Sequence, residues 1–207
     1  ENEGRKYKYL FMATTLGKVK KTELSEFGNI RSSGLIGIKL KADDELAWVK
    51  PTTGNDEVML VTKYGKSIRF NENDVRPMGR ASMGVVGIKF KQKDDSVVVM
   101  DVIRQGETRL LLVSEKGYGK MTKLEEYAVQ GRGGQGVFTF RVTEKTGKLV
   151  SARIIDHPEN DLLIMTKNGI AIMLPLNKGI PTQHRQTTGV KLMDVKSNDE
   201  VATMAVE

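Results

Sequence analysis

Short apolar runs recur along the chain at a nearly constant interval, and each is followed by a glycine. The runs begin at Leu10, Val58, Leu110 and Leu162. A second series of glycines stays in step with the first. The two series are Gly17, Gly65, Gly117 and Gly169, and Gly34, Gly84, Gly136 and Gly189. Two series that keep the same spacing of about 50 residues indicate four structural repeats.

Each repeat has the pattern of four β-strands. The continuous apolar run predicts a buried strand, the glycine a tight turn, and the residues after it a second strand. After the second glycine apolar residues alternate, as at Ile36, Ile38 and Leu40, which predicts a half-buried third strand. A polar turn and a last apolar run, such as residues 46–49, complete the unit. Helical periodicity is confined to residues 22–27 and 122–127.

Four-stranded units that repeat every ~40–50 residues are typical of propeller-like folds. The sequence therefore predicts an all-β fold, a disc of four-stranded blades with four repeats present. Because no low-complexity linker interrupts the pattern, we expect one domain over residues 1–207. The repeats span roughly residues 8–50, 56–102, 108–155 and 160–205.

Composition narrows the function. The chain has no cysteine, which excludes disulfides and thiolate metal sites. It has no apolar run long enough to cross a membrane and no signal-peptide pattern at its first residues, so we expect a cytoplasmic protein. The net charge of +7 favours an acidic partner such as nucleic acid.

The positive charge recurs in the same portion of each repeat. The four segments that lie between the paired glycines carry +2, +2, +1 and +2, which equals the +7 of the whole chain. In a disc, equivalent portions of the blades lie at the same radius, so we expect a basic band that contacts the phosphates of a bent duplex. The alternative is that these cations protect solvated hairpin edges. The predicted DNA contacts are Lys18, Lys20, Lys21, Arg31, Lys66, Arg69, Arg76, Arg80, Lys120, Lys123, Arg132, Lys178 and Arg185.

No residue pattern predicts catalysis or a cofactor. Residues 131–136 match G-x-G-x-x-G, but a strand follows instead of the helix that a dinucleotide site needs. We interpret this segment as a glycine-rich loop whose exposed amides and Arg132 approach a phosphate. The two histidines, His157 and His184, cannot form a metal site alone. The acidic pairs, such as Asp43 and Asp44, stand at turn positions and are expected to cap turns.

The glycine-rich loop also carries a family resemblance. The segment Gln130, Gly131, Arg132, Gly133, Gly134, Gln135 and Gly136 resembles the gyrase A box, Q-R-R-G-G-K-G, and departs from it at Gly131 and Gln135. Further similar segments are residues 11–14, 17–22, 25–27, 74–79, 115–122 and 126–127. The chain as a whole resembles the C-terminal domain of the DNA gyrase A protein. The related domain of the topoisomerase IV A protein is the near alternative.

The resemblance implies a β-pinwheel that wraps duplex DNA around its rim without a cofactor. In such enzymes the rest of the gyrase A protein and the gyrase B protein complete an A2B2 assembly, which supercoils DNA with ATP and holds the catalytic residues. The family's domain typically has six blades, so four repeats indicate truncation on the N-terminal side. The residues alone also allow a different class, a propeller-like module that binds a protein partner. Salt dependence separates the two, since only phosphate contacts weaken steeply with salt.

Overall fold

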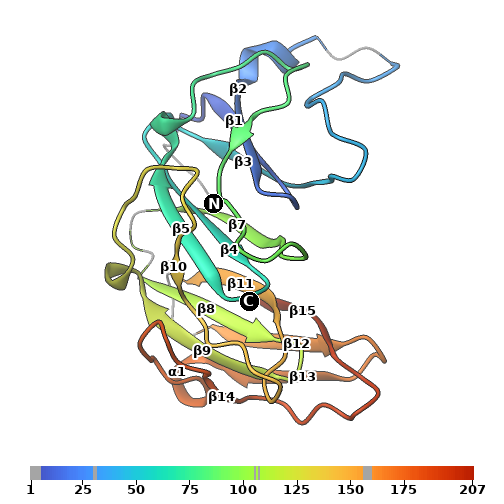
Figure 1. Cartoon of the computed structure of the whole chain (residues 1–207), viewed down its shortest axis with the longest axis vertical. Helices are drawn as coiled ribbons and strands as arrows, with labels where there is room; N and C mark the ends of the chain where they lie inside the picture. The colour runs from blue at the N-terminus through green and yellow to red at the C-terminus, as the bar shows by residue number, and fades with distance from the viewer. Residues whose placement is uncertain (1–5, 30–31, 105, 107, 156–159) are drawn as a thin grey trace. The chain divides into compact units, whose positions relative to one another are not determined.

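The chain is all-β, as predicted (Figure 1). A computed structural model describes residues 6–29, 32–104, 106, 108–155 and 160–207. Three antiparallel sheets have four strands, in the orders β3-β1-β2-β6, β10-β5-β4-β7 and β11-β8-β9-β14, and the fourth sheet has three, β13-β12-β15. Helical structure in these residues is limited to short turns: η1 (Leu24–Phe27), η2 (Glu72–Asp74), η3 (Leu124–Glu126) and α1 (Leu176–Gly179).

The first two strands of each repeat form the predicted hairpin. The turn glycines Gly17, Gly65, Gly117 and Gly169 all have positive φ, between 75° and 83°, a conformation that glycine adopts without steric cost. The hairpin strands are β1 (Tyr9–Thr14) with β2 (Lys18–Glu23), β4 (Glu57–Thr62) with β5 (Lys66–Asn71), β8 (Arg109–Ser114) with β9 (Tyr118–Lys123), and β12 (Asp161–Thr166) with β13 (Ala171–Pro175). The last strands of the repeats are β3 (Leu46–Thr52), β7 (Val97–Ile103), β11 (Leu149–Ile155) and β15 (Val201–Val206).

The third strand differs from the prediction in its partner and its length. It has only two residues in β6 (Val85–Val86), β10 (Val137–Phe138) and β14 (Val190–Lys191). Each pairs with the second strand of the preceding repeat, so β6 lies on β2, β10 on β5 and β14 on β9. In the second, third and fourth repeats the alternating pattern correctly indicated an extended segment that is partly buried, but it does not say which sheet receives that segment.

Among the described residues, this pairing between successive repeats is missing at the first repeat and at the fourth. Residues 35–41 of the first repeat form no strand, and Ile36 is 67% exposed. The fourth sheet receives no strand on β13. In the other repeats the inserted segment brings Ile88, Phe140 and Met193 into the interior, where each is at most 5% exposed.

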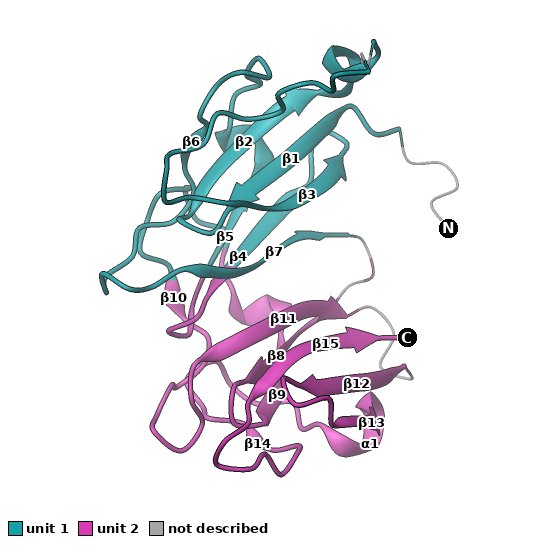
Figure 2. Ribbon diagram, turned by 90° about the vertical axis from the view of Figure 1, so that its right-hand side faces the viewer, with its two compact units in different colours: residues 1–60, 68–104, 129–136 teal, residues 61–67, 105–128, 137–207 magenta. Residues whose placement is uncertain are grey.

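By its residue contacts the chain divides into two compact units (Figure 2). Unit 1 holds residues 1–60, 68–104 and 129–136, and unit 2 holds residues 61–67, 105–128 and 137–207. Each unit has its own apolar core. The core of unit 1 is built around Phe11, Leu60 and Phe70, with Trp48 packed against it, and that of unit 2 around Leu111 and Ile164.

Carboxylates hold the turns between strands, as expected from the acidic pairs. The Asp44 Oδ1 atom accepts hydrogen bonds from the backbone N–H groups of Leu16 at 3.0 Å and Glu45 at 2.9 Å. Asp199 Oδ1 accepts equivalent bonds from Asn168 and Glu200. In the first and fourth repeats these acids therefore connect the hairpin turn to the polar turn before the last strand. Among the helices described, none has the length and hydrophobicity needed to cross a bilayer.

Candidate nucleic-acid interface

Three of the predicted DNA-contacting lysines lie in the interior. Lys20 and Lys120 are 0% exposed and Lys21 is 2% exposed. A buried ammonium must be hydrogen-bonded, and all three are. The prediction treated every lysine of the second strand as a surface cation. Lys20 and Lys120 instead lie beneath the arginine loop of the next repeat, and Lys21, on the opposite face of β2, lies against η2. Direct phosphate contact by these three lysines is therefore inconsistent with their burial.

The Lys20 and Lys120 ammonium groups bind backbone carbonyls, and each binds the carbonyl of an arginine in the following repeat. Lys20 Nζ donates to the carbonyl of Gly37 at 2.8 Å and to that of Arg80. Lys120 Nζ donates to the carbonyls of His184 at 2.6 Å and Arg185 at 2.7 Å. It also donates to the hydroxyl of Thr187 at 3.0 Å. Each lysine thereby closes a loop that carries an arginine.

Lys21 serves a different purpose. Its Nζ donates to the Glu72 carbonyl at 3.0 Å and lies 3.6 Å from the Glu72 carboxylate, which is itself 0% exposed. The ammonium also stands over the ring of Tyr9, 4.9 Å from its centroid. Lys21 is therefore half of a buried ion pair that joins β2 to η2.

An acidic residue in each short 3-10 turn holds the arginine of the next repeat. The carboxylates of Glu26, Asp74 and Glu126 each accept a hydrogen bond from a backbone N–H group. The donors are Arg80 at 3.1 Å, Arg132 at 3.4 Å and Arg185 at 3.2 Å, respectively. The three arginines each stand four residues before a glycine of the second series. Equivalent positions in successive repeats thus share one local geometry.

The glycine-rich loop is fastened to unit 1 by its own amides. Gly133 N–H donates to the Gly87 carbonyl at 2.7 Å, and the Gly134 carbonyl accepts from Lys89 N–H at 2.9 Å. The Arg132 Nε donates to the Asp74 carbonyl at 2.8 Å and its Nη1 to the Val86 carbonyl at 3.1 Å. The prediction of freely exposed amides therefore does not hold at Gly133, while Gly131 and Gln135 are exposed.

A mixed aromatic and cationic cluster surrounds Arg185 in unit 2. Arg185 Nη1 donates to the Phe138 carbonyl at 3.2 Å, and its guanidinium lies 5.9 Å from the Tyr127 ring centroid. Lys66 Nζ stands 3.6 Å from the centroid of Phe138, a ring that is 50% exposed. Two cations of the predicted set, Lys66 and Arg185, thus lie at Phe138, the first at its ring and the second at its carbonyl. The sequence did not reveal this cluster, because the three residues belong to three different repeats.

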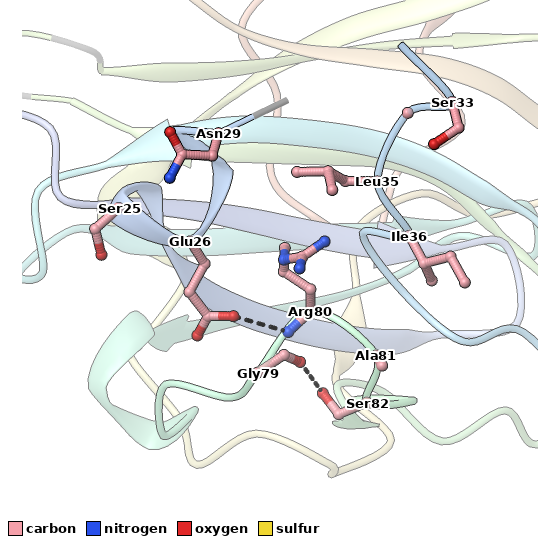
Figure 3. A pocket seen from close by; sticks show the side chains of 11 residues that line it. Ser25, Glu26, Asn29, Ser33, Leu35, Ile36, Gly79, Arg80, Ala81 and Ser82 are labelled. Atoms are coloured by element: carbon pink, nitrogen blue, oxygen red, sulfur yellow. Dashed lines mark hydrogen bonds between the residues drawn. The ribbon is translucent and has the colours of Figure 1, made fainter. Parts of the chain in front are cut away.

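Arg80 occupies the corresponding place in unit 1. It lines a pocket together with Glu26, Leu35 and Ile36, and Figure 3 shows its backbone N–H joined to the Glu26 carboxylate. Arg80 and Ile36 belong to successive repeats, as Arg185 and Phe138 do. Ile36 has the sequence position that Phe138 has in its own repeat, two residues after a glycine of the second series, and Arg80 is the one cation among the described residues that line the pocket.

The other predicted contacts are at or near the surface. Arg76, Lys123 and Lys178 are exposed, and Lys18, Lys66 and Arg69 are half-buried. Lys123 pairs with Glu125 at 3.3 Å, and Arg69 with Glu57 at 2.5 Å. Arg31 and His157 lie outside the described residues. His184 is an exposed loop residue, and its Nδ1 lies 3.1 Å from the Oε1 atom of Glu126. No cluster of potential metal ligands occurs in the part of the chain that the structure describes.

Burial of Lys120 predicts a pH dependence of stability. Loss of hydration lowers the pKa of Lys120 in the folded chain to about 8, from 10.5, against the opposing effect of Glu126. Between these two values the unfolded chain binds more protons, so the free energy of unfolding should rise with pH. We expect a rise on the order of 1–3 kcal/mol between pH 8 and 10. Above pH 10 Tyr127 acts in the opposite direction, since burial raises its pKa to about 12.

Urea unfolding followed by circular dichroism at pH 7.5, 9 and 10 would measure this dependence. The Lys120→Met variant should show a flatter profile than the unaltered chain. Parallel profiles for the two proteins would contradict the assignment to Lys120.

Comparison with known proteins identifies the family. Residues 8–53, 56–104, 108–156 and 160–206 match the family described as DNA gyrase C-terminal domain, beta-propeller. The chain belongs to this family. The four matched segments begin at the same residues as the four repeats of the sequence. The resemblance inferred from the sequence is confirmed.

Full-length relatives of the DNA gyrase C-terminal domain family agree with this assignment. The DNA gyrase A protein of Ureaplasma parvum is 42% identical over 197 residues, which cover 95% of the chain. The corresponding protein of Deinococcus deserti is 43% identical over 193 residues. In both cases the chain spans 23% of the relative's length.

Solved structures of C-terminal domains have the same fold. A DNA gyrase A C-terminal domain superimposes with a TM-score of 0.84 at 25% identity, and covers 99% of the chain and 68% of that structure. The C-terminal domain of DNA topoisomerase IV gives 0.89 at 25% identity, with coverage of 100% and 64%. The fold is thus common to the C-terminal domains of both enzymes.

Proposed function

We propose that the chain binds duplex DNA without sequence specificity and bends it, as the C-terminal domain of the DNA gyrase A protein. In the intact enzyme, with the rest of the gyrase A protein and with the gyrase B protein, it would wrap DNA in support of ATP-dependent negative supercoiling. The site of action would be the bacterial cytoplasm. The equivalent role in topoisomerase IV is the alternative within the family.

One observation carries this proposal. In three successive repeats of a chain with net charge +7, an arginine occupies the same position and has its backbone N–H bound by a carboxylate. Arg80, Arg132 and Arg185 share the acid-bound backbone described above. Arginine suits phosphate because its planar guanidinium presents several N–H donors at once. The repeated contact needs no particular base, since phosphates recur along any duplex.

Bending requires several such contacts to act together. Bending a site of 20–30 base pairs costs roughly 1–6 kcal/mol, so one contact is insufficient. No helix of the described chain is long enough to read bases in the major groove, because the helical elements have three or four residues. Sequence preference should therefore follow the deformability of the DNA.

Titration with unrelated duplexes at several salt concentrations tests the proposal. We expect affinity to fall steeply with salt, with a log–log slope near −0.9 for each phosphate neutralised, and equally for unrelated sequences. Relaxed plasmid treated with a nicking-closing enzyme in the presence of the chain should show an altered linking-number distribution. A protein-interaction module would give neither the slope nor the topological change, and that result would refute the proposal.

A further inference from the structure

In repeats two and four, both the backbone N–H and the backbone carbonyl of the loop arginine are hydrogen-bonded to side chains. In unit 1, Glu26 accepts from the Arg80 N–H and Lys20 donates to the Arg80 carbonyl. In unit 2, Glu126 accepts from the Arg185 N–H and Lys120 donates to the Arg185 carbonyl. The acid and the lysine belong to one repeat and the arginine to the next. The same three-residue arrangement therefore occurs twice, in different units of the chain.

We propose that Lys20 and Lys120 are positioning residues that fix Arg80 and Arg185 for contact with DNA phosphate. This inference rests on the proposed function. Each buried ammonium, together with the acid, immobilises the backbone of its arginine, whose side chain is partly exposed. The DNA contact is thus made by the arginine, and the lysine acts through it.

The physical benefit is preorganisation. A mobile loop must be ordered when it binds, and that ordering reduces affinity. Lys120 removes much of this cost, because its Nζ also binds His184 and Thr187 and so fixes three residues of one turn. The Arg185 side chain is further restrained by the Phe138 carbonyl at 3.2 Å. The guanidinium retains other N–H groups for a phosphate.

The middle arginine shows what happens without the lysine. Ile68 stands in β5 at the position that Lys20 and Lys120 occupy in β2 and β9. There the Arg132 side chain itself donates to the carbonyls of Asp74 and Val86. Arg132 thus replaces the lysine as the donor that closes its loop, and fewer of its N–H groups remain for DNA. We therefore expect Arg132 to contribute less to DNA affinity than Arg80 or Arg185.

A double-mutant cycle on unit 2 tests the inference. The proteins are the unaltered chain, Lys120→Met, Arg185→Gln and the double variant, titrated against a fluorescent duplex of about 40 base pairs at several salt concentrations. Loss of one phosphate contact should weaken binding about eightfold at about 0.1 M salt and reduce the slope by about 0.9. We expect Lys120→Met to approach both values, and the double variant to bind no more weakly than Arg185→Gln alone.

The exposed Lys196 in unit 2 provides a matched control, since Lys196→Met removes the same charge without touching the loop. An effect of Lys120→Met no larger than that of Lys196→Met, or additive effects in the double variant, would overturn the inference. Glu126→Ala is the second variant if Lys120→Met folds poorly. It removes the acceptor of the Arg185 N–H at a position outside the core and should weaken binding in the same non-additive manner, although it also removes a negative charge.

Amide hydrogen exchange separates this inference from the proposed function. In Lys120→Met the amides of residues 185–187 should exchange at least about tenfold faster, while those of β8 remain protected. This result is expected even if the chain failed to bind DNA, in which case only the proposed function would be lost. Unchanged exchange at residues 185–187 would show that Lys120 does not hold the loop.

Discussion

Replacing Gly65 by alanine is expected to destabilise unit 2 by about 2–5 kcal/mol, the sum of two unfavourable terms. Gly65 has φ +78°, a conformation that costs a residue with a Cβ about 1–2 kcal/mol. A Cβ at this position would also lie 2.2 Å from the carbonyl oxygen of Phe140. Phe140 is fully buried, so the collision displaces the backbone of a segment packed in the core, and such overpacking typically costs about 1–3 kcal/mol.

Gly169→Ala is the matched control for this prediction. Gly169 has a similar φ, +83°, but no atom lies within 4 Å of the added Cβ. We expect only the backbone term, about 1–2 kcal/mol. Denaturant unfolding followed by far-UV circular dichroism, with amide exchange of β8 and β9, would report on unit 2, because the single tryptophan, Trp48, lies in unit 1. Equal losses for the two variants would show that the inserted strand does not depend on the space at Gly65.

The turn glycines also show which part of the fold could be predicted from the sequence. The glycine series defined the repeats and the hairpin turns, because positive φ is a local requirement that only glycine meets freely. The sequence did not predict which sheet the third strand of each repeat joins. The segments at Ile88 and Phe140 have the same alternating pattern whether they pair within their own repeat or with the preceding one. Pairing across repeats is a long-range choice that periodicity does not encode.

The charge pattern of the sequence selected candidate DNA-contacting residues, but it did not predict how their side chains are placed. Counting charges between the glycines selected the arginines that share one local geometry, Arg80, Arg132 and Arg185, together with lysines that are buried. The pattern of β2 could have shown the burial, since Lys20 and Lys120 stand two residues before a threonine on the same inward face of their strands. The arginine carbonyls that these lysines bind lie 60 and 65 positions later in the chain, and no local pattern reveals such a contact.

The buried carboxylate of Glu72 is the strongest polar anchor of unit 1. It is 0% exposed and accepts hydrogen bonds from the Thr52 hydroxyl and from the N–H groups of Gly54 and Asp56, each at 2.8 Å. Lys21 lies 3.6 Å away as the opposite charge. Every oxygen of the carboxylate therefore has partners, which is the condition under which a buried ion pair is tolerated.

Glu72→Ala should lower the free energy of unfolding of unit 1 by about 3–5 kcal/mol, because it leaves the Lys21 ammonium buried without its counter-charge and three donors unsatisfied. Lys21→Met should cost less, and the double variant less than the sum of the two, because removing both charges removes the uncompensated one. Trp48 fluorescence during denaturant unfolding reports on this unit. Glu23→Gln, which neutralises an exposed carboxylate two residues from Lys21, should stay within about 0.5 kcal/mol of the unaltered chain. If Glu72→Ala were as stable as Glu23→Gln, the buried pair would contribute no more to stability than a surface ion pair does. The backbone carbonyl of residue 72, which also accepts from Lys21, would then be sufficient to hold the ammonium.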